Sequence, residues 1–304
     1  MTSARLAVID LGTNTFHLLI AEASGGLWKE LFRERIFVNL AEGGIDRIGN
    51  AAKERGMVAL KHFRGIIDDH GISDVMAVGT AALRRAENSD QFVVEVYHEL
   101  GFEIQVIDGQ TEASYINAGV HYAVPDFSSD SLIMDIGGGS VEFIISSNGK
   151  PAFSVSYPIG VAVLYDKFHG KEPINIDQLN HIDQYLTTTM RDLTQKLSRF
   201  SELHLIGASG TFEVIDSALQ KQRGQTPFSK IEKEDFFAMY NRVIPMTYEQ
   251  RMADRNIPST RARYIVVALK LIHHVLSVYP IVDISVSRYA LKEGIVSEWL
   301  SNLD

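Results

Sequence analysis

Short apolar runs separated by polar turns dominate the N-terminal part of the chain. Runs rich in Val, Ile, Leu and Phe, bounded by small or polar residues, are typical of β-strands. They predict strands near Leu6–Asp10, Thr15–Ala23, Trp28–Val38, Val75–Gly79 and Ile104–Ile107.

Other segments place apolar residues at helical spacing. The segment near Ala51–His70 shows this best, because its apolar residues fall on one face of an amphipathic helix. These residues are Met57, Leu60, Phe63 and Ile67. Further helices are expected near Ser89–Leu100 and Thr111–Ala123, with extra helical material over 174–200 and 231–251. Strands that alternate with helices predict an α/β fold.

The pattern occurs twice along the chain. The block LAVIDLGTNTFHLLIAE matches the block SLIMDIGGGSVEFIISS, with Asp10 over Asp135 and Gly12 over Gly137. Two further correspondences follow in the same order, residues 74–89 with 202–217 and residues 103–119 with 283–296. Three matched units in one order indicate a duplicated βββαβαβα domain.

The duplication sets the expected domain boundaries. The first copy is expected over residues 1–125 and the second over 126–304, joined by a short polar crossover at 124–131. Two α/β copies in tandem predict two domains that face each other across a cleft, and ligands in such architectures bind outside the strand ends. We therefore expect the functional site between the copies.

Composition excludes several classes of protein. The chain has 304 residues, of which 45% are hydrophobic and 22% charged, as in a folded globular protein rather than a disordered one. Its net charge of −9 argues against a general nucleic-acid or membrane-surface binder. The cysteine count of 0 removes disulfides and thiolate chemistry. With no signal-like start and no long apolar span, we expect a soluble cytoplasmic protein.

The candidate chemistry lies at the turns of the repeat. Glycines there let backbone N–H groups converge on one point, and with nearby hydroxyls such a concavity suits phosphate oxygens. The residues concerned are Gly12, Thr13, Thr15, Gly137, Gly138, Gly139 and Ser140. Asp10 and Asp135 are hard oxygen ligands that could hold Mg²⁺ directly or through water. A tight hairpin also uses Asp and Gly for its turn, but two related blocks favour phosphate binding.

These blocks resemble the two phosphate motifs of the actin-like (ribonuclease H-like) phosphotransferase superfamily. Within it, the chain is similar to the exopolyphosphatase and guanosine pentaphosphate phosphohydrolase (Ppx/GppA) family. The likeness continues through TAALRRAEN (80–88), similar to a family arginine loop, and DGQTEA (108–113), similar to a Gly-x-Glu-Glu-Ala element. It includes GASGT (207–211), at the position of the superfamily's adenosine motif. The hairpins alone would fit sugar kinases, acetate kinases or Hsp70-like ATPases equally well.

The resemblance implies a role for each matched residue. Glu112 matches a catalytic-base glutamate that orients and deprotonates the attacking water, and Arg84 matches an arginine that grips the terminal phosphate. Asp135 and Glu142 match acidic positions associated with metal and water, and Asp10 completes the expected set for Mg²⁺. The remaining phosphate-site candidates are Asn14, Thr80, Gly207 and Ser209.

Two departures from the family pattern stand out. Thr111 occupies the first place of the usual Glu-Glu pair, so this chain lacks the first carboxylate of that element. Longer members carry a C-terminal helical extension resembling an HD domain, and this chain matches the short form without it. The resemblance also implies a homodimer.

The residues themselves support part of this transfer. Glu112 is expected to open a helix directly after a strand, and a guanidinium such as that of Arg84 suits phosphate geometry better than a lysine. A first-turn glutamate is also favoured by the helix dipole alone, and Arg84 with Arg85 is also a common solvated pair. Three further arginines, Arg261, Arg263 and Arg288, either line a path for a polyanion or form a solvated basic face.

Three functions follow as hypotheses. The first is an enzyme that removes the terminal phosphate from inorganic polyphosphate, or from guanosine pentaphosphate, by metal-assisted in-line attack of water. The second is a kinase of the same superfamily, suggested by the shared hairpins and by Gly207–Thr211. The third is a non-catalytic module that binds polyphosphate or guanosine tetra- and pentaphosphate. No nucleic-acid or membrane partner is expected.

Overall fold

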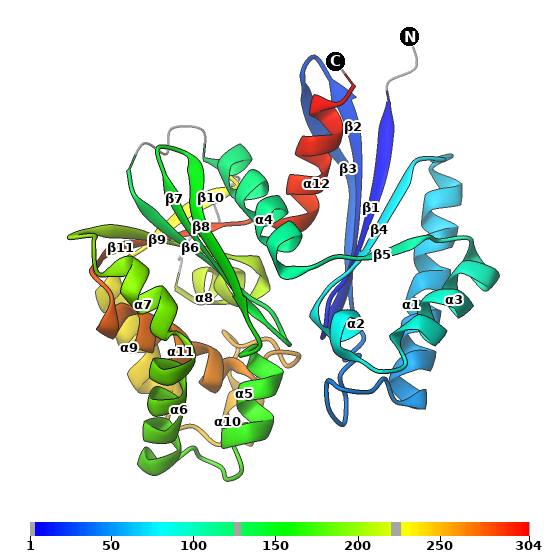
Figure 1. The fold of residues 1–304 in the computed structure, drawn as a ribbon. Helices are drawn as coiled ribbons and strands as arrows, with labels where there is room; N and C mark the ends of the chain where they lie inside the picture. Colours follow the sequence, from blue (N-terminus) through cyan, green and yellow to red (C-terminus); the bar gives the residue numbers. More distant parts are fainter. Residues whose placement is uncertain (1–3, 125–128, 220–225, 304) are drawn as a thin grey trace. The chain divides into compact units, whose positions relative to one another are not determined.

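The chain is described from a computed structural model that covers residues 4–124, 129–219 and 226–303. It divides into two compact units (Figure 1). Unit 1 comprises Met1–Tyr122 with Ala290–Asp304, and unit 2 comprises Ala123–Tyr289. Each unit has its own sheet and its own apolar core, so each is described separately.

Unit 1 is built on a five-stranded sheet of order β3-β2-β1-β4-β5. Its strands are β1 (Arg5–Leu11), β2 (Thr15–Ser24), β3 (Leu27–Phe37), β4 (Val75–Gly79) and β5 (Ile104–Val106). β1 pairs with β2 in antiparallel fashion, whereas β1, β4 and β5 are parallel neighbours. The carboxyl ends of these three strands therefore share one edge of the sheet, where the residues that follow them can meet.

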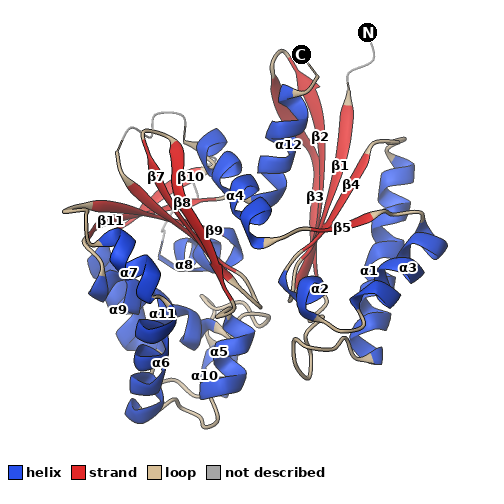
Figure 2. Ribbon diagram, viewed as in Figure 1, coloured by secondary structure: helices blue, strands red, loops and turns tan. Residues whose placement is uncertain are grey.

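Helices cover both faces of this sheet. They are α1 (Asn50–Asp69), α2 (Ala81–Arg85), α3 (Ser89–Leu100), α4 (Gly109–Ala123) and α12 (Leu291–Ser301). In Figure 2, α1 and α3 lie on one face, and α4 and α12 on the other. The apolar stripe of α1, with Leu60, Phe63 and Ile67 fully buried, packs into the same core as Ile9 and Leu18 of the sheet.

Unit 2 repeats the arrangement with one strand more. Its six-stranded sheet has the order β10-β11-β9-β6-β7-β8. The strands are β6 (Ser131–Ile136), β7 (Val141–Ser147), β8 (Lys150–Tyr157), β9 (Leu203–Ala208), β10 (Phe228–Ile231) and β11 (Ile281–Ser287). Without β10, which pairs antiparallel with β11, the order matches that of unit 1 strand for strand.

The helices of unit 2 form a larger layer around α11. They are α5 (Val161–Phe168), α6 (Ile176–Thr189), α7 (Arg191–Leu197), α8 (Ser209–Leu219), α9 (Lys233–Val243), α10 (Tyr248–Ala253) and α11 (Ile265–Val278). α11 is apolar on nearly every side and contacts α5, α6 and α9. Because these helices surround α11, its long apolar sequence is explained by burial in the core of the unit.

The structure confirms the α/β class and the duplication. The expected strands and helices of the first copy are present with ends shifted by a few residues at most, and the extra helical material of the second copy forms α6, α7, α9 and α10. The shared strand order means that β1 corresponds to β6 and β2 to β7 in the repeat. The expected crossover includes residues 125–128, which lie outside the described residues.

The C-terminal helix is grouped differently from the expected division at residue 125. We expected residues 126–304 to form one copy, whereas α12 contacts β1, β2 and β3 and belongs to unit 1. It packs closely on α4, since a Cβ at Gly294 would lie 1.8 Å from the Tyr115 carbonyl oxygen. A Cβ at Gly119 would likewise lie 2.0 Å from the carbonyl oxygen of Ala290. Glycine at both positions lets the two helix backbones approach this closely.

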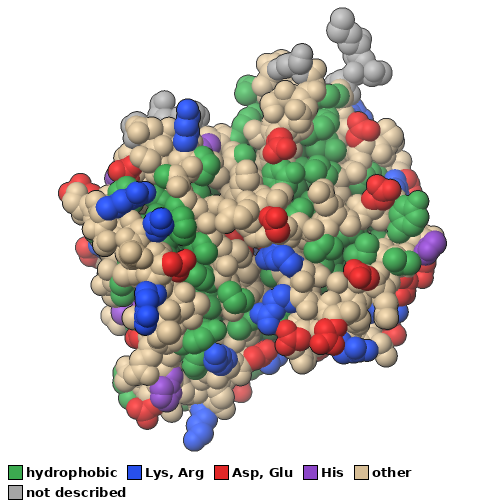
Figure 3. Space-filling model, in the orientation of Figure 1, with side chains coloured by type: hydrophobic (Ala, Val, Ile, Leu, Met, Phe, Trp, Pro, Cys, Tyr) green, Lys and Arg blue, Asp and Glu red, His purple; other side chains and the backbone are tan. Residues whose placement is uncertain are grey.

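Two surface properties bear on the excluded classes. In the described part of the chain, no helix has both the length and the apolar character needed to cross a membrane. On the face drawn in Figure 3, acidic and basic side chains are interspersed.

Candidate functional site

The β1–β2 turn of unit 1 directs its carbonyl groups into the unit. The N–H of Gly12 donates to the Thr15 carbonyl (3.1 Å), which closes the turn. The Thr13 carbonyl accepts from the N–H of Leu40 (2.8 Å), and the Asn14 carbonyl accepts from two N–H groups of the segment after β3 (both 2.9 Å). The N–H groups of Thr13 and Asn14 have no partner among the described residues, although these residues are only 3% and 5% exposed.

Asn14 carries a second unsatisfied group. Its side-chain Oδ1 is buried and has no hydrogen-bond partner among the described residues. Buried polar groups are normally paired, because an unpaired one loses its hydration without compensation. The turn therefore presents polar atoms that a ligand would satisfy.

The loop after β4 places Arg84 beside Glu112. Thr80 follows β4 directly, is buried, and donates its N–H to the Leu11 carbonyl (3.3 Å), so it fixes the start of α2 against β1. One turn later, Nη1 of Arg84 donates both to the Ile107 carbonyl and to Oε2 of Glu112, each at 2.9 Å.

The Arg84 guanidinium is open on one edge. Nη1 of Arg84 makes both contacts, so Nε and Nη2 have no partner in the described part of the chain. The Arg84 side chain is 24% exposed and the Glu112 side chain 9%. A guanidinium with a free edge next to a shielded carboxylate can bind a phosphate oxygen while the carboxylate faces a water molecule.

The start of α4 holds Glu112 in place. Asp108 follows β5, and its carboxylate accepts from the Thr111 N–H (2.8 Å), while its carbonyl accepts from the Glu112 N–H (3.0 Å). The hydrogen bonds from Thr111, together with the charge of Arg84, lower the pKa of Asp108 below its ordinary value. Thr111, in place of a second glutamate, thus belongs to the cap of this helix.

The β6–β7 turn of unit 2 resembles the β1–β2 turn of unit 1, because its carbonyl groups also accept hydrogen bonds from a neighbouring segment of the same unit. The carbonyls of Gly137, Gly138 and Gly139 accept from the N–H groups of Val161, Ala162 and Gly160, at 2.9–3.2 Å. The glycine loop is therefore fastened to the start of α5. The N–H groups of Gly138, Gly139 and Ser140 have no partner in the part of the chain that the structure describes. Consecutive unpaired N–H groups of this kind form an anion-binding concavity.

The loop after β9 joins this turn through Asp135. Ser209 donates its hydroxyl to Oδ2 of Asp135 at 2.6 Å, and Asp135 itself is only 6% exposed. Ser209 has a left-handed backbone with φ of 66°, which costs energy for a residue other than glycine. Gly207 precedes it where a Cβ would overlap the Phe212 ring. The structure thus brings Ser209 to Asp135, whereas Gly207 serves packing.

The acidic residues of unit 2 fit a magnesium ion. Asp135 and Glu142 are directly opposite each other on β6 and β7, and both are buried. Oε1 of Glu142 accepts from the Ser156 hydroxyl (2.7 Å), so each carboxylate has one oxygen oriented by a serine. Mg²⁺ is usually held by one or two carboxylates, with water and substrate phosphates completing its shell. No larger group of His, Asp and Glu suited to a metal occurs among the described residues.

Arg261 is a further cation at this site. The sequence alone allowed two interpretations for it, a path for a polyanion or a solvated basic face. A Cβ at Gly210 would lie 2.3 Å from Nη2 of Arg261, so the guanidinium lies against the first turn of α8, next to Ser209. Only the folded structure shows this proximity, because the sequence spacing between residues 207–211 and residue 261 does not indicate it. Arg263 instead lies over the Tyr165 ring at 4.8 Å, and Arg288 faces Asp216 at 3.9 Å.

The predicted residues thus fall into two sets. In unit 1 the structure gathers Gly12, Thr13, Asn14, Thr15, Thr80, Arg84 and Glu112 at the carboxyl ends of β1, β4 and β5, with Asp10 on β1. In unit 2 it gathers Asp135, Gly137, Gly138, Gly139, Ser140, Glu142, Gly207 and Ser209 at the ends of β6 and β9. A site between the two sets stays a prediction.

The chain is similar to several known proteins along nearly its whole length. Its fold is similar to the crystal structure of an exopolyphosphatase from Cytophaga hutchinsonii, with 35% identity, a TM-score of 0.94 and coverage of 98% of each chain. The Ppx/GppA family member from Aquifex aeolicus shares the fold, with 22% identity, a TM-score of 0.82 and coverage of 99% of each chain. A relative from Haemophilus influenzae is 28% identical over 293 residues, which is 96% of this chain and 90% of that protein.

The family model carries the assignment. Residues 19–303 match the model of the Ppx/GppA phosphatase family, so the match includes Arg84, Glu112, the β6–β7 turn and α12. Because this match extends over most of the chain, the chain belongs to the Ppx/GppA phosphatase family.

Proposed function

We propose that this protein is an exopolyphosphatase-type phosphohydrolase that releases terminal phosphate from inorganic polyphosphate, from guanosine pentaphosphate, or from both. Membership of a phosphatase family supports a phosphohydrolase in general. The observation that carries the finer proposal is the Arg84–Glu112 pair, in which a shielded carboxylate contacts a guanidinium whose other edge is open.

The proposed reaction divides the work between two side chains. Glu112 orients a water molecule and accepts its proton as the water oxygen attacks the terminal phosphorus in line. Nε and Nη2 of Arg84 bind the oxygens of the transferred group, on which negative charge is concentrated. The P–O bond to the bridging oxygen breaks, and the shortened chain leaves with the electron pair. Protein groups that are fixed before the reaction stabilise its charge most effectively.

The two glycine turns are proposed to hold the rest of the polyanion. Unpaired N–H groups bind phosphate oxygens without adding positive side chains, which suits a protein of net charge −9. The guanidinium of Arg261, which lies against the start of α8, supplies a further cation in unit 2. Mg²⁺, when held by Asp135 and Glu142, would offset phosphate charge that the few arginines leave unbalanced.

The first test is phosphate release by the purified protein. We expect release from tripolyphosphate and long-chain polyphosphate or from guanosine pentaphosphate. Glu112→Gln should lower kcat by about 10²–10⁴-fold, because the amide cannot accept the proton. Glu103→Gln, an exposed glutamate one strand position before β5, is the matched control and should keep full activity.

Two outcomes would replace the proposal. Formation of ADP from ATP only when an acceptor is present would indicate a kinase. Tight binding of polyphosphate with no turnover would indicate a binding module. We also propose that the protein is a homodimer. Light scattering of the protein as it elutes from a size-exclusion column would check this.

Metal removal gives a second, independent test. Treatment with a chelator should abolish phosphate release, and added Mg²⁺ should restore it, if Asp135 and Glu142 hold the cation. Asp135→Asn and Glu142→Gln should each raise the Mg²⁺ concentration needed for half-maximal activity. Full activity in chelator would contradict the proposed ligands.

A further inference from the structure

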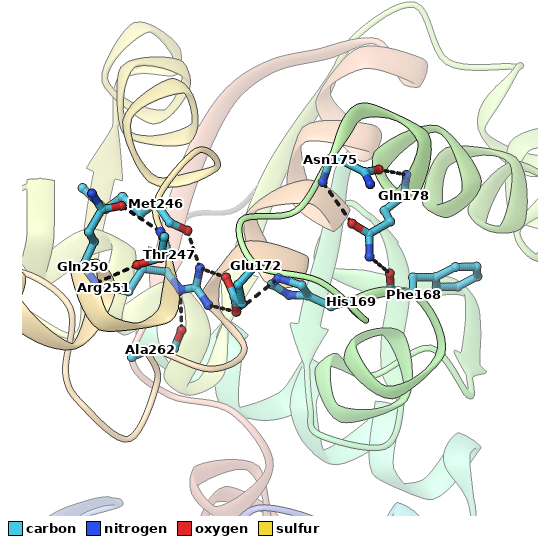
Figure 4. Close-up of polar contacts among 10 residues, drawn as sticks. All are labelled: Phe168, His169, Glu172, Asn175, Gln178, Met246, Thr247, Gln250, Arg251 and Ala262. Atoms are coloured by element: carbon cyan, nitrogen blue, oxygen red, sulfur yellow. Dashed lines mark hydrogen bonds and ion pairs between the residues drawn. The ribbon is translucent and has the colours of Figure 1, made fainter.

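Arg251 is a fully buried cation that the proposed reaction does not use. It lies on α10 with 0% exposure and is the largest fully buried side chain in the described part of the chain. Figure 4 shows the guanidinium among four acceptors. Nη2 and Nη1 donate to Oε1 and Oε2 of Glu172 at 2.6 and 2.9 Å, Nη1 donates to the Met246 carbonyl at 2.7 Å, and Nε donates to the Ala262 carbonyl at 2.7 Å.

The fourth contact connects this cluster to the candidate site. Ala262 is buried and stands next to Arg261, whose Nη2 would lie 2.3 Å from a Cβ at Gly210. The Ala262 carbonyl accepts from Arg251, so this peptide unit has a fixed direction. The Arg261 carbonyl is fixed as well, since it accepts from the N–H groups of Tyr264 and Ile265 at 3.0 Å.

Stability alone does not require charges here. Removing the Arg251 guanidinium from water is costly, even with a Glu172 side chain that stays 27% exposed, and well-packed apolar side chains often give a fold of equal stability. The bidentate geometry does something that apolar packing does not, because it fixes the direction of four acceptors around one planar group. These acceptors belong to three segments: Glu172 lies after α5, Met246 lies between α9 and α10, and Ala262 lies before α11.

We propose that Arg251 and Glu172 are positioning residues that set the guanidinium of Arg261 against the start of α8, where it binds the anionic substrate. The inference rests on the proposed function in taking a phosphate chain as the ligand. It concerns binding and not the chemical step, so Arg251 touches no reacting atom. Loss of the Arg251–Glu172 pair should therefore weaken substrate binding and leave kcat nearly unchanged.

The test measures binding in a background that cannot turn over. In Glu112→Gln protein, calorimetry with sodium tripolyphosphate and Mg²⁺ gives Kd directly, so the result does not depend on hydrolysis. Arg261→Gln should raise Kd by about tenfold, as expected for one lost charge-assisted hydrogen bond. Arg251→Met combined with Glu172→Leu, an apolar pair chosen to keep the fold, should raise Kd by the same factor.

Non-additivity separates positioning from general destabilisation. The triple variant, with Arg261→Gln added to the apolar pair, should bind no more weakly than Arg261→Gln alone, because both changes remove the same contact. In otherwise native protein, KM should rise about tenfold with kcat kept within about twofold. Unchanged Kd in the apolar pair, or a further tenfold loss in the triple variant, would overturn the proposal.

Folding failures also give an answer. Arg251→Lys keeps the charge but cannot donate to the four acceptors in one plane, so it should fold and bind weakly. If neither this variant nor the apolar pair folds, the pair is required for the fold itself and the positioning role is wrong. Absence of any phosphate release by the native protein would contradict the proposed function while leaving the binding comparison intact.

Discussion

Glu112 and Glu293 occupy matching places in the two copies and have different surroundings. Each lies in the first turn of the last helix of its copy, α4 or α12. Glu112 contacts Nη1 of Arg84 at 2.9 Å and has a side chain that is 9% exposed. Glu293 is 0% exposed, contacts Nη1 of Arg33 at 2.7 Å and Nζ of Lys292 at 3.2 Å, and accepts from the Ala290 N–H at 2.8 Å.

The difference shows how one position serves two purposes. Burial raises the pKa of Glu293, but the charges of Lys292 and Arg33 and the bond from Ala290 outweigh it, so the pKa is lowered overall and the carboxylate stays ionised. Both cations are held against it, so it has no role left for a substrate and instead joins α12 to β3. At Glu112 the partner guanidinium contributes only Nη1, so Nε and Nη2 of Arg84 have no partner among the described residues.

The largest effect that tests this comparison is expected for Glu293→Gln. The neutral amide leaves Lys292 without its counter-charge and Arg33 with Glu30 alone, and breaking a buried ion pair costs about 3–5 kcal/mol in the free energy of unfolding. Denaturant unfolding monitored by circular dichroism checks this. Glu112→Gln is the matched substitution and should cost far less stability while removing most activity. Equal loss of stability in both variants would mean that the two glutamates do not differ in this way.

A smaller effect is expected at the turn of unit 2. A Cβ at Gly160 would lie 2.4 Å from the carbonyl carbon and oxygen of Gly138, so Gly160→Ala should push the glycine loop away from α5. Overpacking of this kind costs about 1–3 kcal/mol, and the displaced N–H groups should also weaken phosphate binding. Thermal unfolding and KM measure the two effects.

Gly170→Ala is the control for this substitution. A Cβ there has no heavy atom within 4 Å, and Gly170 follows the same helix, α5. It should leave both the unfolding temperature and KM unchanged. If Gly160→Ala behaved in the same way, the contact between α5 and the loop would not hold the loop in place.

How much of this the sequence predicts depends on the distance between the interacting residues along the chain. The turn residues lie within one block, so the pattern of strand, Asp and glycines predicts the two hairpins and their duplication. Arg84 and Glu112 are 28 residues apart; the resemblance indicates that both belong to the site, and only the structure shows that they pair. Arg251 and Glu172 are 79 residues apart, and nothing local marks Arg251 as buried or Glu172 as its partner.

The grouping of α12 with unit 1 could not be predicted for a related reason. Apolar periodicity shows that a helix has a buried face, but it does not show which sheet covers that face. The repeat favours the second copy, as expected from residues 283–296. The close approach at Gly119 and Gly294 and the Arg33–Glu293 contact decide otherwise, and both join residues that are far apart in the chain.

The smallest expected effect concerns pH and three histidines of unit 2. Burial is the main cause that lowers the pKa of His169, His273 and His274 below the ordinary value of 6.5. The unfolded chain therefore takes up protons at these rings at a higher pH than the folded chain. Their contribution to stability is complete above pH 6.5 and is lost as the pH falls below that value.

Denaturant unfolding between pH 7.5 and pH 5.5 measures this loss, which should lie in unit 2. His274→Gln should flatten the dependence, because its Nδ1 faces Asp183 at 3.0 Å with Lys270 close by and the ring is 4% exposed. His98→Gln, on the exposed side of α3 in unit 1, is the matched control. If both variants kept the full dependence on pH, the loss of stability would come from carboxylates elsewhere and not from the buried rings of unit 2.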